Sequence, residues 1–161
     1  MSEQAATPDW LPVAPPPRVE LSTGGHLRPV GPEDADRMMS AVAGSQPRLW
    51  SIYGDVWDWP AADLTREQNH QDLVRHAAEA VALEAFTYGL FDAGESQILG
   101  CVYIDPPQYA HTDAEVSWWV VTPLVGSKIE AGLDELVPRW LADRWPFRAP
   151  NFPHNGPARR V

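Results

Sequence analysis

The chain has 161 residues, which is the length of one domain with a substantial core. Its formal net charge is -10, with 12 Lys and Arg against 22 Asp and Glu, so it would repel a nucleic-acid backbone, and we expect no nucleic-acid partner. Its one cysteine, Cys101, excludes a disulfide framework and favours a reducing compartment.

The sequence predicts neither a targeting segment nor a membrane span. The N-terminus has no basic segment followed by an apolar one, and no stretch approaches the ~18 consecutive apolar residues of a membrane span. We therefore expect a cytoplasmic protein with no membrane partner.

Proline marks the two ends of the chain. Residues 1–25 are proline-rich and end in two glycines, which predicts a flexible arm, either loosely held or anchored on the domain or a neighbouring subunit. The residues from Pro153 to 161 are expected to form a disordered tail. One domain is thus expected over 26–152.

The first half of this domain predicts a strand, a helix and an aromatic loop. A short extended segment begins at His26, and Pro32 then starts a helix. Residues 45–64 follow neither the helical nor the strand period, so we expect a structured loop there. It carries a group of aromatic residues that either forms a wall for an apolar or cationic ligand or plugs the end of the sheet: Trp50, Tyr53, Trp57 and Trp59.

The second half predicts a helix, three strands, a helix and a strand. Thr65 and Gln68 fit a capping box that opens a helix to about residue 83. Residues 85–91 and 97–104 predict an antiparallel hairpin, and 114–121 alternates as a third strand. A second capping box at Ser127 opens a helix, and a strand is expected over 147–152. The order β-α-α-β-β-β-α-β predicts an α+β fold, with a mixed, mostly antiparallel sheet flanked by helices.

Several of these segments resemble the GCN5-related N-acetyltransferase (GNAT) family. They are Leu27-Arg28-Pro29-Val30 followed by Pro32-Glu33-Asp34-Ala35, the segment Ile98–Ile104 with Gly100, and the segment from Ala114 to Pro123. The resemblance covers residues 26 to about 152. It implies a GNAT-like α/β sandwich that uses acetyl-CoA as co-substrate and transfers acetyl to a primary amine of a small molecule or peptide.

The resemblance also implies where the cofactor binds. In the family, backbone N–H groups between the fourth strand and the third helix hold the pyrophosphate, and the preceding strand contacts the pantetheine arm. In this sequence the corresponding positions are Val120, Val121, Gly126, Ser127, Lys128 and Ile129. Of the family's glycine positions only Gly126 is kept, and Glu130 replaces the last. Lys128, the only lysine, either binds phosphate or lies on a solvated surface.

Glu115 is the candidate general base, because it lies on the strand that supplies the base in many relatives; the alternative is a solvated structural carboxylate. No Tyr follows residue 152, so either the acceptor site is open or its wall comes from the 45–64 loop, the arm or a second subunit of a homodimer. No metal site is expected. Two functions remain open: an acetyl-CoA-dependent N-acyltransferase, and a non-catalytic GNAT-like module that has lost productive CoA binding.

Overall fold

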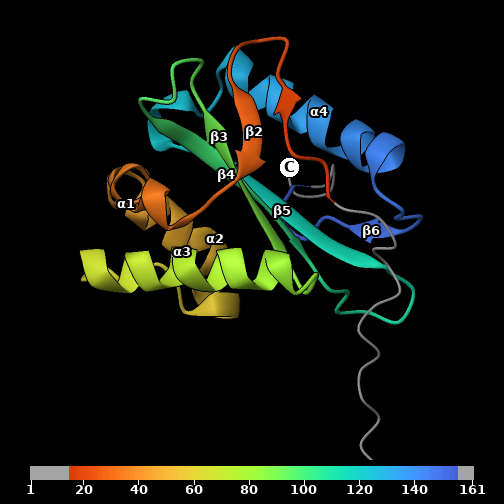
Figure 1. The fold of residues 1–161 in the computed structure, drawn as a ribbon, viewed down its shortest axis with the longest axis horizontal. Coiled ribbons are helices and arrows are strands. Elements are labelled where there is room, and N and C mark those ends of the chain that lie inside the picture. Colours follow the sequence, from red (N-terminus) through yellow and green to blue (C-terminus); the bar gives the residue numbers. More distant parts are fainter. Residues whose placement is uncertain (1–14, 156–161) are drawn as a thin grey trace, which may run out of the picture.

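The computed structural model describes residues 15–155 and contains a six-stranded sheet in which the strands lie in chain order (Figure 1). Neighbouring strands are antiparallel except for the last pair, which is parallel. The strands are β1 (Val19–Glu20), β2 (His26–Pro29), β3 (Phe86–Phe91), β4 (Ile98–Asp105), β5 (Ala114–Val120) and β6 (Pro150–Asn151). The predicted mixed, mostly antiparallel α+β fold is confirmed.

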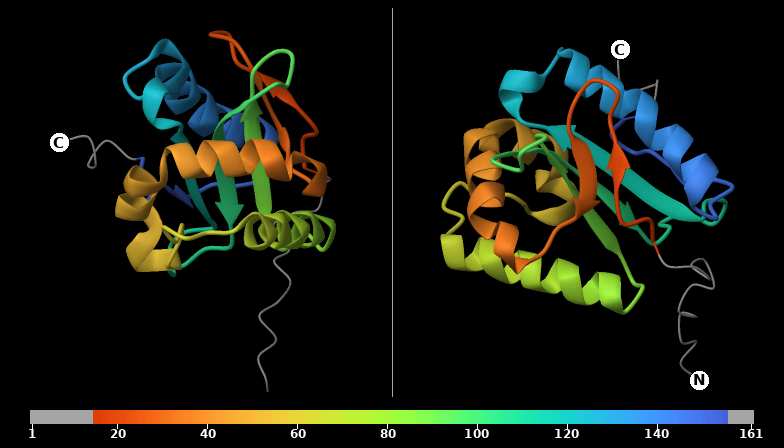
Figure 2. Two further views of the ribbon diagram at one scale, coloured as in Figure 1. Left: turned by 90° about the vertical axis from the view of Figure 1, so that its left-hand side faces the viewer. Right: turned by 45° about the horizontal axis from the view of Figure 1, so that its top comes forward.

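Helices cover both faces of this sheet (Figure 2). One face carries α1 (Ala35–Gly44), α2 (Gln46–Trp57) and α3 (Arg66–Val81), and the other carries α4 (Lys128–Arg144). Two short 3-10 turns precede α1 and α4: η1 (Pro32–Asp34) and η2 (Thr122–Leu124). Within residues 15–155, no helix is both long enough and apolar enough to cross a bilayer.

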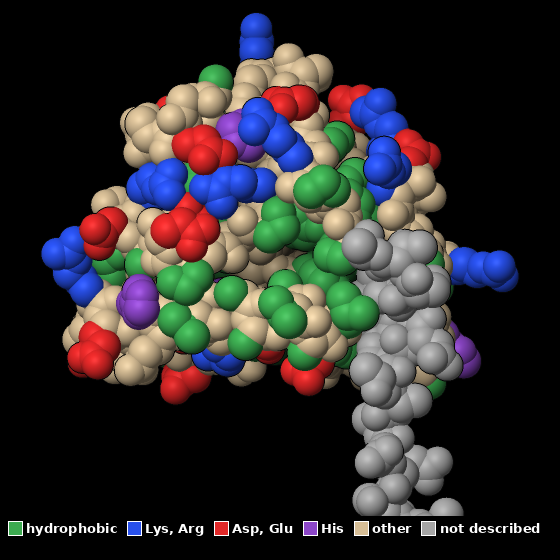
Figure 3. All heavy atoms as spheres, viewed as in Figure 1, with side chains coloured by type: hydrophobic (Ala, Val, Ile, Leu, Met, Phe, Trp, Pro, Cys, Tyr) green, Lys and Arg blue, Asp and Glu red, His purple; other side chains and the backbone are tan. Residues whose placement is uncertain are grey.

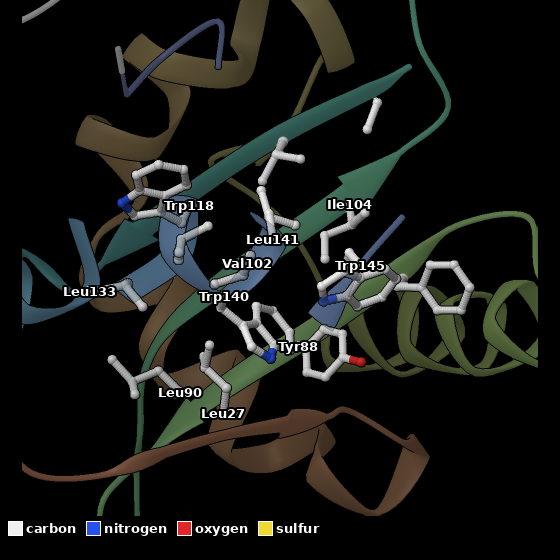
Figure 4. Packing of buried hydrophobic residues seen from close by; sticks show 14 of the residues in the cluster. Leu27, Tyr88, Leu90, Val102, Ile104, Trp118, Leu133, Trp140, Leu141 and Trp145 are labelled. Atoms are coloured by element: carbon white, nitrogen blue, oxygen red, sulfur yellow. The ribbon is translucent and has the colours of Figure 1, made fainter. Parts of the chain in front are cut away.

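Strand alternation divides the interior into two cores. On β5, Val116, Trp118 and Val120 face the core under α4, whereas Trp119 faces the core under α1, α2 and α3. The α4 core is strongly aromatic: the rings of Tyr88 and Trp140 meet edge to face at 4.9 Å between the sheet and α4 (Figure 4). Neighbouring residues of β5 therefore pack into different cores, one under α4 and the other under α1, α2 and α3.

The predicted helix starts are confirmed at both capping positions. The Thr65 hydroxyl accepts a hydrogen bond from the Gln68 amide at 3.1 Å, and the Gln68 side chain accepts one from the Thr65 amide at 2.9 Å. The Ser127 hydroxyl caps α4. α4 continues to Arg144 with Pro138 inside it. Sequence signals thus located these two helices.

The prediction of a loop over residues 45–64 is wrong, because most of this segment is the helix α2. Leu49 and Tyr53, four residues apart, are fully buried on one side of it. Trp50, on another side of α2, lies over Gly54, where a Cβ atom would be only 2.8 Å from the indole ring. Aromatic residues on more than one side of the helix hide the apolar stripe, and the glycine that suggested a loop makes room for a ring.

The ends of the chain differ from the sequence expectations within the described residues. β1 lies inside the segment expected to be an arm, and it pairs with β2 across the glycine turn at Gly24 and Gly25. The last strand spans two residues instead of 147–152. Residues 1–14 of the predicted arm and 156–161 of the predicted tail lie outside the described part of the chain.

Candidate functional site

The two last strands separate soon after they meet. β6 pairs with β5 only at Ala114 and Glu115, whereas β5 continues to Val120 in register with β4. The amide of Val121 donates to Leu99 O at 2.9 Å, so backbone groups of alternate β5 residues face β4. The backbone groups of Trp118 and Val120 consequently face away from β4, along the part of the β5 edge that does not pair with β6.

This edge of β5 leads into the N-terminus of α4. η2 and Gly126 join them, and Gly126 has a φ of 80°, a left-handed value that favours glycine. The first N–H groups of a helix have no partner within the helix and attract anions. Lys128, which begins α4, is exposed. The predicted cofactor residues from Val120 to Ile129 thus run from the end of β5 to the first turn of α4, with Val120 buried and Gly126 and Lys128 exposed.

A carboxylate of the chain itself lies at this helix N-terminus. Glu130 Oε1 accepts a hydrogen bond from Gly126 N at 2.9 Å, while the Glu130 amide donates to Ser127 Oγ at 3.4 Å. The predicted box differs in one detail, because the Glu130 carboxylate reaches the residue before the cap. The Gly126 amide, which could bind an external anion, thus already binds a carboxylate of the chain itself.

Arg48 connects this carboxylate to β5, and the sequence did not single it out. From α2, Arg48 Nη1 donates to Val120 O at 2.6 Å, and Nη2 lies 3.6 Å from Glu130 Oε2. Near it, Ser45 Oγ accepts a hydrogen bond from Thr122 N at 2.8 Å. The segment expected to be an aromatic loop therefore supplies a cation to the end of β5.

Asn155 also binds the β5 edge, although it lies in the segment expected to be disordered. Its Nδ2 donates to Trp118 O and its Oδ1 accepts from Trp118 N, both at 3.0 Å. One side-chain amide therefore makes the pair of hydrogen bonds that an additional strand would make.

The predicted base lies on β5 opposite a second carboxylate. Glu115 Oε2 accepts a hydrogen bond from Asn151 Nδ2 at 2.9 Å, and Glu115 is the register partner of Asp105 on β4. Burial, together with the charges of Glu79 and Glu115, raises the pKa of Asp105 to about 7. The sequence did not identify Asp105, because only strand pairing places it beside Glu115.

Three of the four predicted acceptor residues gather around Tyr103 on the same face. Tyr53 and Trp57 stack at 4.5 Å, and Trp57 and Trp59 meet Tyr103 edge to face at 5.0 and 6.5 Å. Trp57 is 42% exposed, whereas Tyr53 is fully buried and donates to Ser117 Oγ at 3.2 Å. Trp57 thus offers an accessible ring, with Tyr53 beneath it.

Two other titratable groups lie near these rings: Cys101 is fully buried and His76 is partly buried. Burial is the main cause that lowers the pKa of His76 to about 4, so its imidazole is neutral at pH 7. Burial likewise raises the pKa of the Cys101 thiol to about 12, so this cysteine is a core residue and not a nucleophile. No group of three or more His, Cys, Asp or Glu residues within 15–155 is placed to hold a metal ion.

Comparison with solved structures places this arrangement in a known fold. The structure of RimL, a ribosomal L7/L12 alpha-N-protein acetyltransferase in complex with coenzyme A, matches with a TM-score of 0.61 and 16% identity, over 76% of this chain and 67% of RimL. The chain has the GNAT fold. No family model matches the sequence, and no curated protein matches it.

Other GNAT structures match over similar lengths. An acetyltransferase from Salmonella typhimurium that modifies the N-terminal serine of L7/L12 matches with a TM-score of 0.60 and 14% identity, over 78% of this chain and 68% of that one. The GNAT domain of S. lividans PAT matches with a TM-score of 0.53 and 20% identity, over 80% and 72%. The chain thus spans about two thirds of the length of the RimL structure.

Proposed function

We propose that the protein is an N-acyltransferase that uses acetyl-CoA to acetylate the primary amine of a small molecule or peptide. The observation that carries this proposal is the continuity of three features: the β5 edge that β6 leaves free, the α4 N-terminus into which it leads, and the carboxylate of Glu115 on the same strand. Helix N-termini bind phosphate groups. The RimL neighbour, whose structure contains coenzyme A, supports the same cofactor.

The residues at the β5–α4 junction suit the cofactor's chemistry. Gly126, Ser127, Lys128 and Ile129 would hold the diphosphate, with Lys128 as a cation at the helix start and Val120 and Val121 beside the pantetheine arm. When bound, the cofactor supplies an acetyl group activated as a thioester. The backbone edge and the helix terminus would orient the cofactor through main-chain groups, to which Lys128 would add a positive charge.

Glu115 is the residue that would accept the proton of the amine. Its carboxylate is held by Asn151 and lies on the sheet face that also carries Asp105 and the Trp57 ring. A carboxylate within reach of an ammonium group, directly or through water, acts as a general base. The acidic character of the chain favours a cationic acceptor.

The neighbouring structures support an amine acceptor. RimL is described as an alpha-N-protein acetyltransferase, and the Salmonella protein as one that modifies an N-terminal serine, so both act on protein N-terminal amines. We propose an acceptor of this chemical class, a primary amine on a peptide or small molecule, for a cytoplasmic enzyme. A homodimer would supply a further wall for the acceptor.

The test is acetyl transfer to a panel of primary amines and N-terminal peptides, measured as thiol release. The wild-type chain should turn over at least one of them, and Glu115→Gln should lower turnover by about 100-fold or more while leaving CoA affinity unchanged. Glu135→Gln, a loss of one exposed carboxylate on α4, is the matched control. Equal turnover of wild type and Glu115→Gln would contradict the role of Glu115.

A second candidate function is a non-catalytic GNAT-like binding or interaction module. It is favoured by the occupation of Trp118, Val120 and Gly126 backbone groups by side chains of the chain itself. Titration with CoA and acetyl-CoA separates the two functions. The variants Asn155→Ala, Arg48→Ala and Glu130→Ala each remove one of these side chains. If neither the wild type nor any of these variants binds at millimolar cofactor, the module is the correct function.

A further inference from the structure

Beyond its two-residue pairing with β6, the edge of β5 is bonded by a side-chain amide of the chain itself. Asn155 bonds both the N–H and the C=O of Trp118 at 3.0 Å. The pantetheine arm of CoA contains amide groups, which can form hydrogen bonds with a strand edge of this kind. Asn155 therefore occupies hydrogen-bonding groups that an amide-bearing ligand would use.

At the N-terminus of α4, a carboxylate of the chain lies where the proposed function places a phosphate. The Glu130 carboxylate accepts the Gly126 N–H at 2.9 Å and places negative charge near the positive end of α4. A diphosphate approaching the same N–H groups would meet a like charge. It would have to displace Glu130 before it could take the Gly126 donor.

Arg48 contacts both of these regions. It donates to Val120 O at 2.6 Å and lies 3.6 Å from the Glu130 carboxylate, and the side chains of Arg48 and Glu130 are 28% and 26% exposed. A partly solvated ion pair at this distance is weak. The guanidinium can therefore change partners at small cost, and its fork of N–H donors fits a phosphate as well as a carboxylate.

We infer that the chain occupies its own proposed cofactor site: Asn155 stands in for the pantetheine amide, Glu130 for the diphosphate, and Arg48 is the cation that exchanges Glu130 for the diphosphate on binding. This inference rests on the proposed function and adds a mechanism by which affinity is controlled. Because two internal groups must leave, the cofactor affinity of the wild type is lowered by the fraction of molecules in which the site is free. Figure 3 shows one face of the molecule, on which acidic and basic side chains are intermixed.

The experiment is calorimetric titration with CoA of the full chain and five variants. Asn155→Ala and Glu130→Ala should each tighten CoA binding by about tenfold, since each removes one internal competitor. Arg48→Ala introduced into Glu130→Ala should cancel that gain. Arg48→Ala alone should not strengthen binding. Glu135→Ala on the same helix removes an equal charge from an exposed side chain that pairs with Arg139, and it should bind as the wild type does.

A second measurement shows whether the internal contacts exist without cofactor. In amide NMR spectra of the CoA-free protein, Asn155→Ala should shift the Trp118 resonance and Glu130→Ala the Gly126 resonance, while thermal unfolding verifies that each variant is folded. Unchanged resonances at these amides would overturn the inference, as would Glu130→Ala binding CoA no more tightly than the wild type.

The titration also separates this inference from the proposed function. Tight wild-type binding that the variants do not improve overturns self-occupation and leaves the acyltransferase intact. CoA binding that appears only in the variants supports both self-occupation and the acyltransferase function. If no folded variant binds CoA at millimolar concentration, self-occupation and the acyltransferase function are both overturned. If Arg48→Ala fails to reduce the affinity of Glu130→Ala, the role of Arg48 is wrong.

Discussion

Asp105 on β4 and Glu115 on β5 are register partners, so two carboxylates lie opposite each other at the end of the sheet where β6 joins β5. Glu79 on α3 adds a third negative charge near Asp105. Like charges at close range disfavour ionisation, and burial acts in the same direction. The fold therefore maintains a carboxyl group whose pKa lies near neutrality on the face proposed to receive the amine.

The pairing of Asp105 with Glu115 predicts that the difference in stability between the wild type and Asp105→Asn depends on pH. The pKa of Asp105 is raised to about 7 in the folded chain, chiefly by burial, so ionisation above its unfolded pKa of about 3.9 destabilises the fold. The penalty grows from about pH 4 to pH 7 and then stays constant. Asp105→Asn should therefore raise the melting temperature by several degrees at pH 8 and by much less at pH 4.5. Thermal unfolding of both proteins at the two pH values measures this difference, and an equal gain at both would contradict it.

The buried carboxylate of Asp34 predicts a large loss of stability on substitution. Asp34 is fully buried and accepts hydrogen bonds from Arg28 Nη1 and Nη2 at 3.0 and 2.9 Å, from Arg37, and from Gly31 N at 2.9 Å. Asp34→Ala would leave these donors without their acceptor, so we expect a loss of about 3–5 kcal/mol in the free energy of unfolding.

Urea denaturation measures the Asp34 effect against a control from the same region. Asp36 is exposed and forms a surface ion pair with Arg66, so Asp36→Ala should cost less than about 1 kcal/mol. Similar losses for Asp34→Ala and Asp36→Ala would show that the Arg28–Asp34 contact is not important for stability.

Gly100 predicts a steric effect between two strands. A Cβ atom there would lie 2.3 Å from the backbone oxygen of Trp119, and backbone cannot move aside cheaply. Gly100→Ala should destabilise the chain by about 3 kcal/mol or more, whereas Gly94→Ala, where a Cβ has nothing within 4 Å, should stay within about 1 kcal/mol of the wild type. Chemical denaturation of the two variants tests this, and equal stability would argue against close approach of β4 and β5.

The sequence by itself determined most of the secondary structure. Capping residues such as Thr65 and Ser127 act over three positions, and the alternation in β5 is visible in its own residues. These signals are local, so they survive without knowledge of the fold. α2 was missed because Trp50 and Tyr53 put large rings on different sides of the helix, which removes the contrast on which helical periodicity depends.

Only the tertiary structure shows which distant side chains contact the candidate cofactor site. The resemblance to the GNAT family predicted Glu115 and the junction from Val120 to Ile129, and it could do so because both lie along one continuous segment. Arg48 reaches Val120 across 72 positions, and Asn155 reaches Trp118 across 37. Such contacts depend on the packing of α2 against the sheet and on the separation of β6 from β5. The sequence around a single Arg or Asn does not indicate which distant residue it will contact, since that partner is set only when the chain has folded.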